Sequence, residues 1–104
     1  MLQDVESSHF SALKGQSTQL YLADGRVLSV RVDGVTEKPL ARVSDEQQRM
    51  PFMVNLSAPD AADVDGGLCA IELPAIGRVD DVFVSRVEPA GRDPRAAYFC
   101  IVFT

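Results

Sequence analysis

Three acidic residues in the stretch PDAADVDGGLCAIE follow a pattern close to that of a calcium-binding loop. If Asp65 takes the fifth position of such a loop, Asp63 takes the third and Glu72 the twelfth, where a carboxylate binds the ion. Ala61 then occupies the first position, so one essential oxygen ligand is missing. Asp63, Asp65 and Glu72 are the nearest approach to a metal site, but we predict a solvated turn, with no metal and no other cofactor.

A second pair of acids, Asp80 and Asp81, interrupts an apolar run. Two carboxylates can act as an acid/base pair only when both reach the same substrate atom. Adjacent residues in a β-strand point to opposite faces, so these two are not expected to converge. We predict instead that they lie on an edge strand, where charges discourage sheet-to-sheet association.

The histidine and the two cysteines are the remaining reactive side chains. A single histidine, His9, excludes zinc sites with two or three histidines, and nothing in the spacing requires it to meet Cys69 or Cys100. Both cysteines lie in apolar runs, so we expect free thiols, or one disulfide if their strands adjoin. The chain also lacks a serine nucleophile elbow, a P-loop and a dinucleotide fingerprint. The sequence therefore favours a non-catalytic role.

The elements that position these residues begin with a strong hairpin signal, Asp24-Gly25, between two alternating runs in STQLYLADGRVLSVRV. A two-residue loop would mix apolar and polar side chains on both faces. A three-residue loop over 23–25, with Gly25 in the left-handed conformation, places Leu20 opposite Leu28 and Thr18 opposite Val30. Apolar residues then share one face, so we predict the three-residue loop.

The rest of the chain predicts one short helix and four more strands. Residues 8–15, SHFSALKG, contain a possible N-cap at Ser8, two apolar residues, Phe10 and Leu13, on one face, and Gly15 as a stop. The further strand-like runs are 51–57, 68–74, 78–89 and 98–104. We therefore predict a mainly β fold, a small antiparallel six-stranded barrel or tight sandwich with one short N-terminal helix.

Length, composition and charge limit the possible functions. A chain of 104 residues with 46% hydrophobic residues predicts a single folded domain over 1–104. The net charge of −5 opposes binding to nucleic acid and to anionic membrane surfaces. No signal peptide is visible, and no window approaches the roughly 18 apolar residues of a membrane span. We expect a cytoplasmic protein that does not bind nucleic acid or a membrane.

Several blocks together resemble a family of small bacterial proteins described as a domain of unknown function. They are the short helix before Gly15, the Asp-Gly hairpin, RMPFMVNLSAPDAADVDGGLCAIELPAIG, and RVDDVFVSRVEP with the closing YFCIVFT. The resemblance covers nearly the whole chain and implies a bacterial source and a compact β domain. In that family a histidine tends to occur where this chain has Leu73. The resemblance implies no established reaction and no functional residues.

The last strand, YFCIVFT, is apolar on both faces. One face carries Phe99, Ile101 and Phe103, and a strand of this kind must be covered twice. The other face needs a cover from outside the barrel, so its residues are the interface candidates: Tyr98, Cys100 and Val102. We therefore predict a structural or protein-interaction module that binds a protein partner or a second copy of itself.

The alternative is a β-barrel that binds a small ligand. Four aromatic residues could line a pocket at the barrel mouth or under the helix: Tyr21, Phe52, Phe83 and Tyr98. Small barrels are usually filled by their own side chains, so the interaction module is the favoured prediction.

Overall fold

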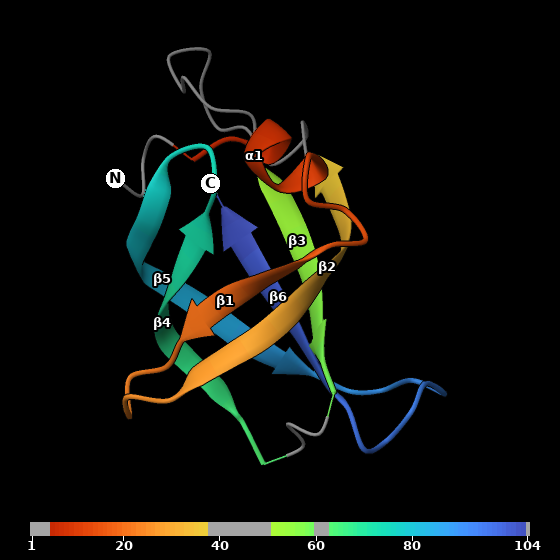
Figure 1. Ribbon diagram of the computed structural model, residues 1–104. Coiled ribbons are helices and arrows are strands. Elements are labelled where there is room, and N and C mark those ends of the chain that lie inside the picture. Colours follow the sequence, from red (N-terminus) through yellow and green to blue (C-terminus); the bar gives the residue numbers. More distant parts are fainter. Residues whose placement is uncertain (1–4, 38–50, 60–62, 104) are drawn as a thin grey trace.

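The computed structural model describes residues 5–37, 51–59 and 63–103 (Figure 1). Within these ranges the elements are α1 (Ser7–Ser11), β1 (Ser17–Tyr21), β2 (Val27–Glu37), β3 (Phe52–Ala58), β4 (Gly66–Leu73), β5 (Gly77–Val87) and β6 (Ala97–Phe103). The strands form a closed antiparallel barrel in the order β1-β2-β3-β6-β5-β4. This confirms the mainly β prediction and selects the barrel over the sandwich. Thr104, in the predicted last strand, lies outside the described residues.

The β1–β2 hairpin has the predicted register. Thr18 pairs with Val30 and Leu20 with Leu28, and Gly25 takes a left-handed φ of +93°. Leu20 and Val30 are fully buried. The hydrophobic pattern therefore selects the three-residue loop, because the alternative register would expose part of this face.

One end of the barrel, here called the helix end, lies under α1 (Figure 1). The helix begins after Glu6, which is its N-cap, and not after Ser8 as predicted. Three phenylalanine rings fill this end: Phe10 lies 6.1 Å from Phe52 and 5.5 Å from Phe103 between ring centroids. All three are buried. We call this cluster of Phe10, Phe52 and Phe103 the aromatic plug.

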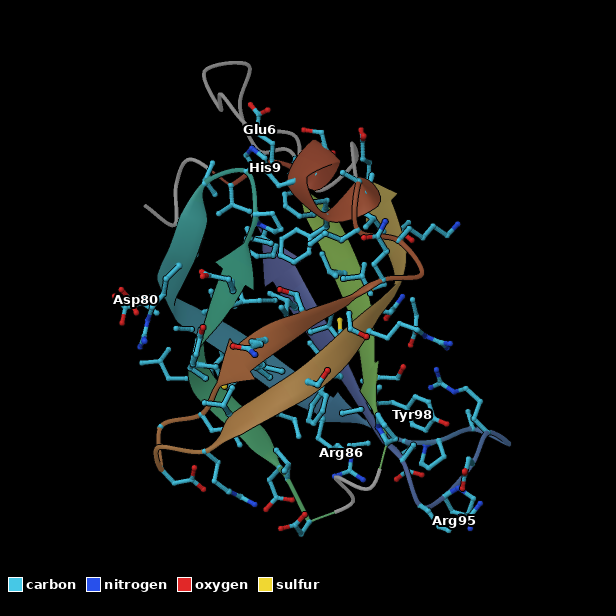
Figure 2. The ribbon with its side chains drawn as sticks, in the orientation of Figure 1. Glu6, His9, Asp80, Arg86, Arg95 and Tyr98 are labelled. Atoms are coloured by element: carbon cyan, nitrogen blue, oxygen red, sulfur yellow. The ribbon has the colours of Figure 1, made fainter. Side chains whose placement is uncertain are left out.

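The opposite end, the hairpin end, is closed by polar contacts. Arg86 extends from the end of β5, where Figure 2 labels it, and its Nη1 donates a hydrogen bond of 2.5 Å to the backbone oxygen of Val64. Arg26 of the hairpin joins Asp24 at 2.8 Å and Asp63 at 3.0 Å. Charged side chains therefore connect the loops at this end.

The barrel closes through one narrow seam in particular. β1 pairs with β4 only at Leu20–Ile71 and Tyr21–Ala70. In contrast, β3 pairs with β6 along its whole length, from Phe52 to Ala58. The sheet therefore has one firmly connected side and one side where closure depends on few backbone contacts.

The prediction for Asp80 and Asp81 was wrong on two points: the edge position of their strand and the opposite directions of the two side chains. Neither residue lies on an edge strand, because β5 pairs with β4 on one side and β6 on the other. The register between β4 and β5 also shifts here, and Asp81 takes a φ of +61°. Val79 and Val82 on either side are both buried, so this β-bulge leaves both acids on the outer surface.

Candidate functional site

The outer face of β6 is only partly covered. Phe99, Ile101 and Phe103 point inward and are buried, as the alternation predicted. On the outer face, the guanidinium carbon of Arg92 lies 3.8 Å from the centre of the Tyr98 ring, which is 8% exposed. Val102 is 64% exposed. The loop between β5 and β6 thus covers one end of this face and leaves the other end open.

Exposed apolar side chains continue from β6 onto the neighbouring strands. Leu68 of β4 is 54% exposed and lies opposite Phe83 of β5, which is 64% exposed. Phe83 and Val102 each lie two residues beyond the paired positions Ser85 and Cys100. We call Leu68, Phe83 and Val102 the outer apolar row, since they lie on three consecutive strands of the barrel, β4, β5 and β6. Cys69, Ile71 and Leu73 are buried, so the alternation of a strand places Leu68 outward, and this signal is already present in the sequence.

The four aromatic residues considered for a pocket do not lie together. Phe52 belongs to the aromatic plug, whereas Phe83 belongs to the outer apolar row. Tyr21 lies on the outside of β1, with the guanidinium carbon of Arg78 4.6 Å from its ring centre. Tyr98 alone borders the groove described next. No common pocket is formed, because these residues face different sides of the barrel wall.

An open groove of about 750 Å³ lies on the flank of the barrel. Its lining comes from three parts of the chain: the α1–β1 connection, β2, and β6 with its preceding loop. The lining residues are Lys14, Gly15, Arg31, Val32, Asp33, Arg92 and Tyr98. We call this the cationic groove. Sequence reasoning missed it, because its basic residues are far apart in the chain and only the topology brings them together.

The acids considered as metal ligands lie apart. The carboxylate of Asp63 pairs with Arg26, whereas Asp65 is exposed before β4. Glu72 lies near the other end of β4, where one buried carboxylate oxygen has no hydrogen-bond partner. In the described ranges, no group of three potential metal-ligating side chains is found.

Asp24 has a local structural role at the hairpin end. The backbone N–H of Arg26 donates to its Oδ1 at 3.0 Å, and the guanidinium of Arg26 binds its Oδ2 at 2.8 Å. These bonds favour the ionised form and lower the pKa of Asp24. The hydrogen bonds from Arg26 to Asp24 and Asp63 in turn raise the pKa of Arg26.

His9 and the cysteines do not form a catalytic pair in the structure. Nδ1 of His9 accepts a hydrogen bond of 2.9 Å from the backbone N–H of Glu6, so the ring caps its own helix (Figure 2). Cys69 and Cys100 are not joined by a disulfide, and β5 separates their strands in the barrel. Burial raises the pKa of Cys69 and keeps this thiol protonated at neutral pH.

These features define a small antiparallel β-barrel closed by a helix at one end and by polar contacts at the other. None of the helical segments in the described part of the chain has the length and apolarity that a membrane crossing requires. The model of the family described as Domain of unknown function (DUF6916) matches residues 5–103, so the chain belongs to this family. No curated protein and no solved structure matches the chain significantly.

Proposed function

We propose that this domain is a non-catalytic protein-interaction module that self-associates through the outer apolar row. The observation that carries this proposal is the exposure of Leu68, Phe83 and Val102, each by more than half of its side chain, on consecutive strands. Exposed apolar side chains of this size on neighbouring strands are typical of protein interaction sites, because water is released when a partner covers them.

A second copy of the chain is the proposed partner because the surface is compatible with itself. In a two-fold symmetric dimer each residue of the interface meets the same surface of the other copy, so apolar side chains can pack against apolar side chains. Beside the row, β5 carries both signs of charge, with Arg78 paired to Asp80 at 3.0 Å. A copy approaching along β5 therefore meets both acidic and basic groups.

The polar side chains that could have suggested catalysis have structural partners. His9 caps α1, and Asp63 pairs with Arg26. These contacts support a non-catalytic role. We also propose that the module is cytoplasmic, where the thiols of Cys69 and Cys100 would stay reduced.

The test is the mass of the protein in solution, measured by size-exclusion chromatography with light scattering over a range of concentrations. We expect a dimer at high micromolar concentration, and a monomer with unchanged circular dichroism for Phe83→Asp and Leu68→Ser. Val27→Ser is the matched control, because Val27 is 55% exposed but lies on β2, which β1 separates from β4. This variant should remain a dimer. A wild-type monomer at the highest concentration would refute self-association.

A further inference from the structure

The cationic groove differs in charge from the protein as a whole. The chain carries a net charge of −5, yet three basic residues and one acid line the groove: Lys14, Arg31, Arg92 and Asp33. Nε of Arg31 lies 2.7 Å from Oδ1 of Asp33, so this acid is already paired. Three positive charges less one negative charge leave the groove with a local charge of +2. Like charges repel, so gathering them on an acidic protein favours a site that attracts an anion.

Two residues that line the groove, Arg31 and Tyr98, lie on either side of Ser57 in the sheet. Ser57 of β3 pairs with Arg31 of β2 on one side and with Tyr98 of β6 on the other. Its neighbours Leu56 and Ala58 are buried in the core, so Ser57 faces the outer side between two residues of the groove. Ser57 is only 9% exposed, and its hydroxyl makes no side-chain hydrogen bond to another described residue. A nearly buried hydroxyl of this kind is a potential donor to a bound ligand.

Arg92 is held in position by its own loop. Its Nε donates to the backbone oxygen of Pro89 at 2.7 Å, and its Nη2 donates to that of Glu88 at 3.2 Å. The ring of Tyr98 lies against the guanidinium group. These contacts engage Nε and Nη2, so the hydrogens of Nη1 are available to a ligand.

The backbone of the loop contributes to the same positioning. The N–H of Arg92 bonds to the oxygen of Pro89 at 3.1 Å, and the two residues between them, Ala90 and Gly91, have φ values of +52° and +90°. This is a tight turn with both central residues left-handed. A guanidinium group that is already oriented loses less entropy when it binds an oxyanion.

We propose that the cationic groove binds a small-molecule oxyanion, a carboxylate or a phosphate, with Arg92 as the main anchor and Lys14 and Arg31 as supporting charges. Its volume of about 750 Å³ is in the range of small-molecule sites. A nucleic acid is not the favoured ligand, because a phosphate backbone needs basic residues along an extended path. Arg92 covers the face of Tyr98, so recognition depends on charge and hydrogen bonding rather than on ring stacking.

The test is a titration of the ¹⁵N-labelled protein with inorganic phosphate and, separately, with citrate, followed by NMR at constant ionic strength with sodium chloride as the reference salt. We expect saturable shifts of the amide signals of Gly15, Arg31, Ser57 and Arg92 with at least one of the two anions. Saturation with phosphate only indicates a phosphate ligand, and saturation with citrate only indicates a carboxylate ligand.

Substitutions distinguish a site from general attraction of anions. Arg92→Gln should weaken binding by about tenfold or more, since it removes a charged donor group. Lys14→Gln should weaken binding less, because a flexible ammonium group gives a less directional contact. Arg95→Gln is the matched control: Arg95 lies in the same loop and pairs with Asp93, but it does not line the groove.

Shifts that do not saturate, or that respond equally to Arg92→Gln and Arg95→Gln, would overturn the proposal. The groove contains no residue of the outer apolar row, so this result is independent of self-association.

Discussion

The two ends of the barrel are closed by opposite kinds of chemistry. At the helix end, the aromatic plug is buried, with 4.6 Å between the ring centroids of Phe52 and Phe103. At the hairpin end, Arg86 reaches a backbone oxygen, and Arg26 joins two loops through ion pairs. The first closure depends on removing apolar surface from water, and the second on directed contacts between charged and polar groups.

This difference suggests a division of roles, in which the helix end supplies most of the stability and the hairpin end carries part of the candidate binding site. Burial of large aromatic side chains contributes several kcal/mol, whereas exposed ion pairs contribute about 1 kcal/mol or less. Substitutions in the polar loops at the hairpin end should therefore cost less stability. The loop between β5 and β6, which carries Arg92 of the cationic groove, lies at this end (Figure 1). The helix end should dominate the free energy of unfolding, and one substitution at each end tests that comparison.

The largest effect is expected for Phe10→Ala. This substitution opens a cavity in the aromatic plug and should lower the free energy of unfolding by about 3 to 5 kcal/mol. Chemical denaturation measures this change. Val27→Ala is the control, because it shortens a side chain in a residue that is 55% exposed and lies outside the outer apolar row. Equal losses for the two variants would show that the helix end is not a main source of stability.

A smaller effect is expected for Arg86→Ala at the hairpin end. The variant loses the hydrogen bond from Arg86 to the backbone oxygen of Val64 and should lose about 1 to 3 kcal/mol in the same measurement. Arg95→Ala, at an exposed ion pair in a neighbouring loop, should change stability by less than about 1 kcal/mol. If Arg86→Ala cost as much as Phe10→Ala, the polar closure would be as important as the aromatic plug.

The smallest effect concerns Cys69, whose pKa burial raises from the ordinary value of 9.0. As the pH rises above about 9, the thiol of the unfolded chain ionises while the buried thiol stays protonated, so the folded state loses relative stability. We expect the stability of the wild type relative to Cys69→Ala to fall as the pH rises from about 8 to about 10. Denaturation curves at several pH values measure this difference. A constant difference would mean that Cys69 ionises equally easily in both states.

Local sequence patterns were sufficient for most of the fold. The Asp24-Gly25 signal and the positions of Leu20 and Leu28 predicted the hairpin register, which the structure confirms. Alternation also placed Phe99 and Ile101 in the core. These predictions succeed because strand faces repeat every two residues and a turn constrains only its near neighbours. The predicted helix start was wrong because Ser8 is of a residue type preferred at an N-cap, whereas the hydrogen bond between the backbone of Glu6 and the ring of His9 makes Glu6 the cap.

The sequence by itself thus determined the strands, the inward faces and the acidic character of this protein. Only the tertiary structure decided which outward side chains stay exposed, that Asp80 and Asp81 form a bulge, and that Lys14, Arg31 and Arg92 border one groove. The reason is physical: alternation states which side of a strand a residue occupies, but not which distant strand lies beside it or which loop covers it. Barrel closure brings those segments together, and the candidate sites exist only as a result of that closure.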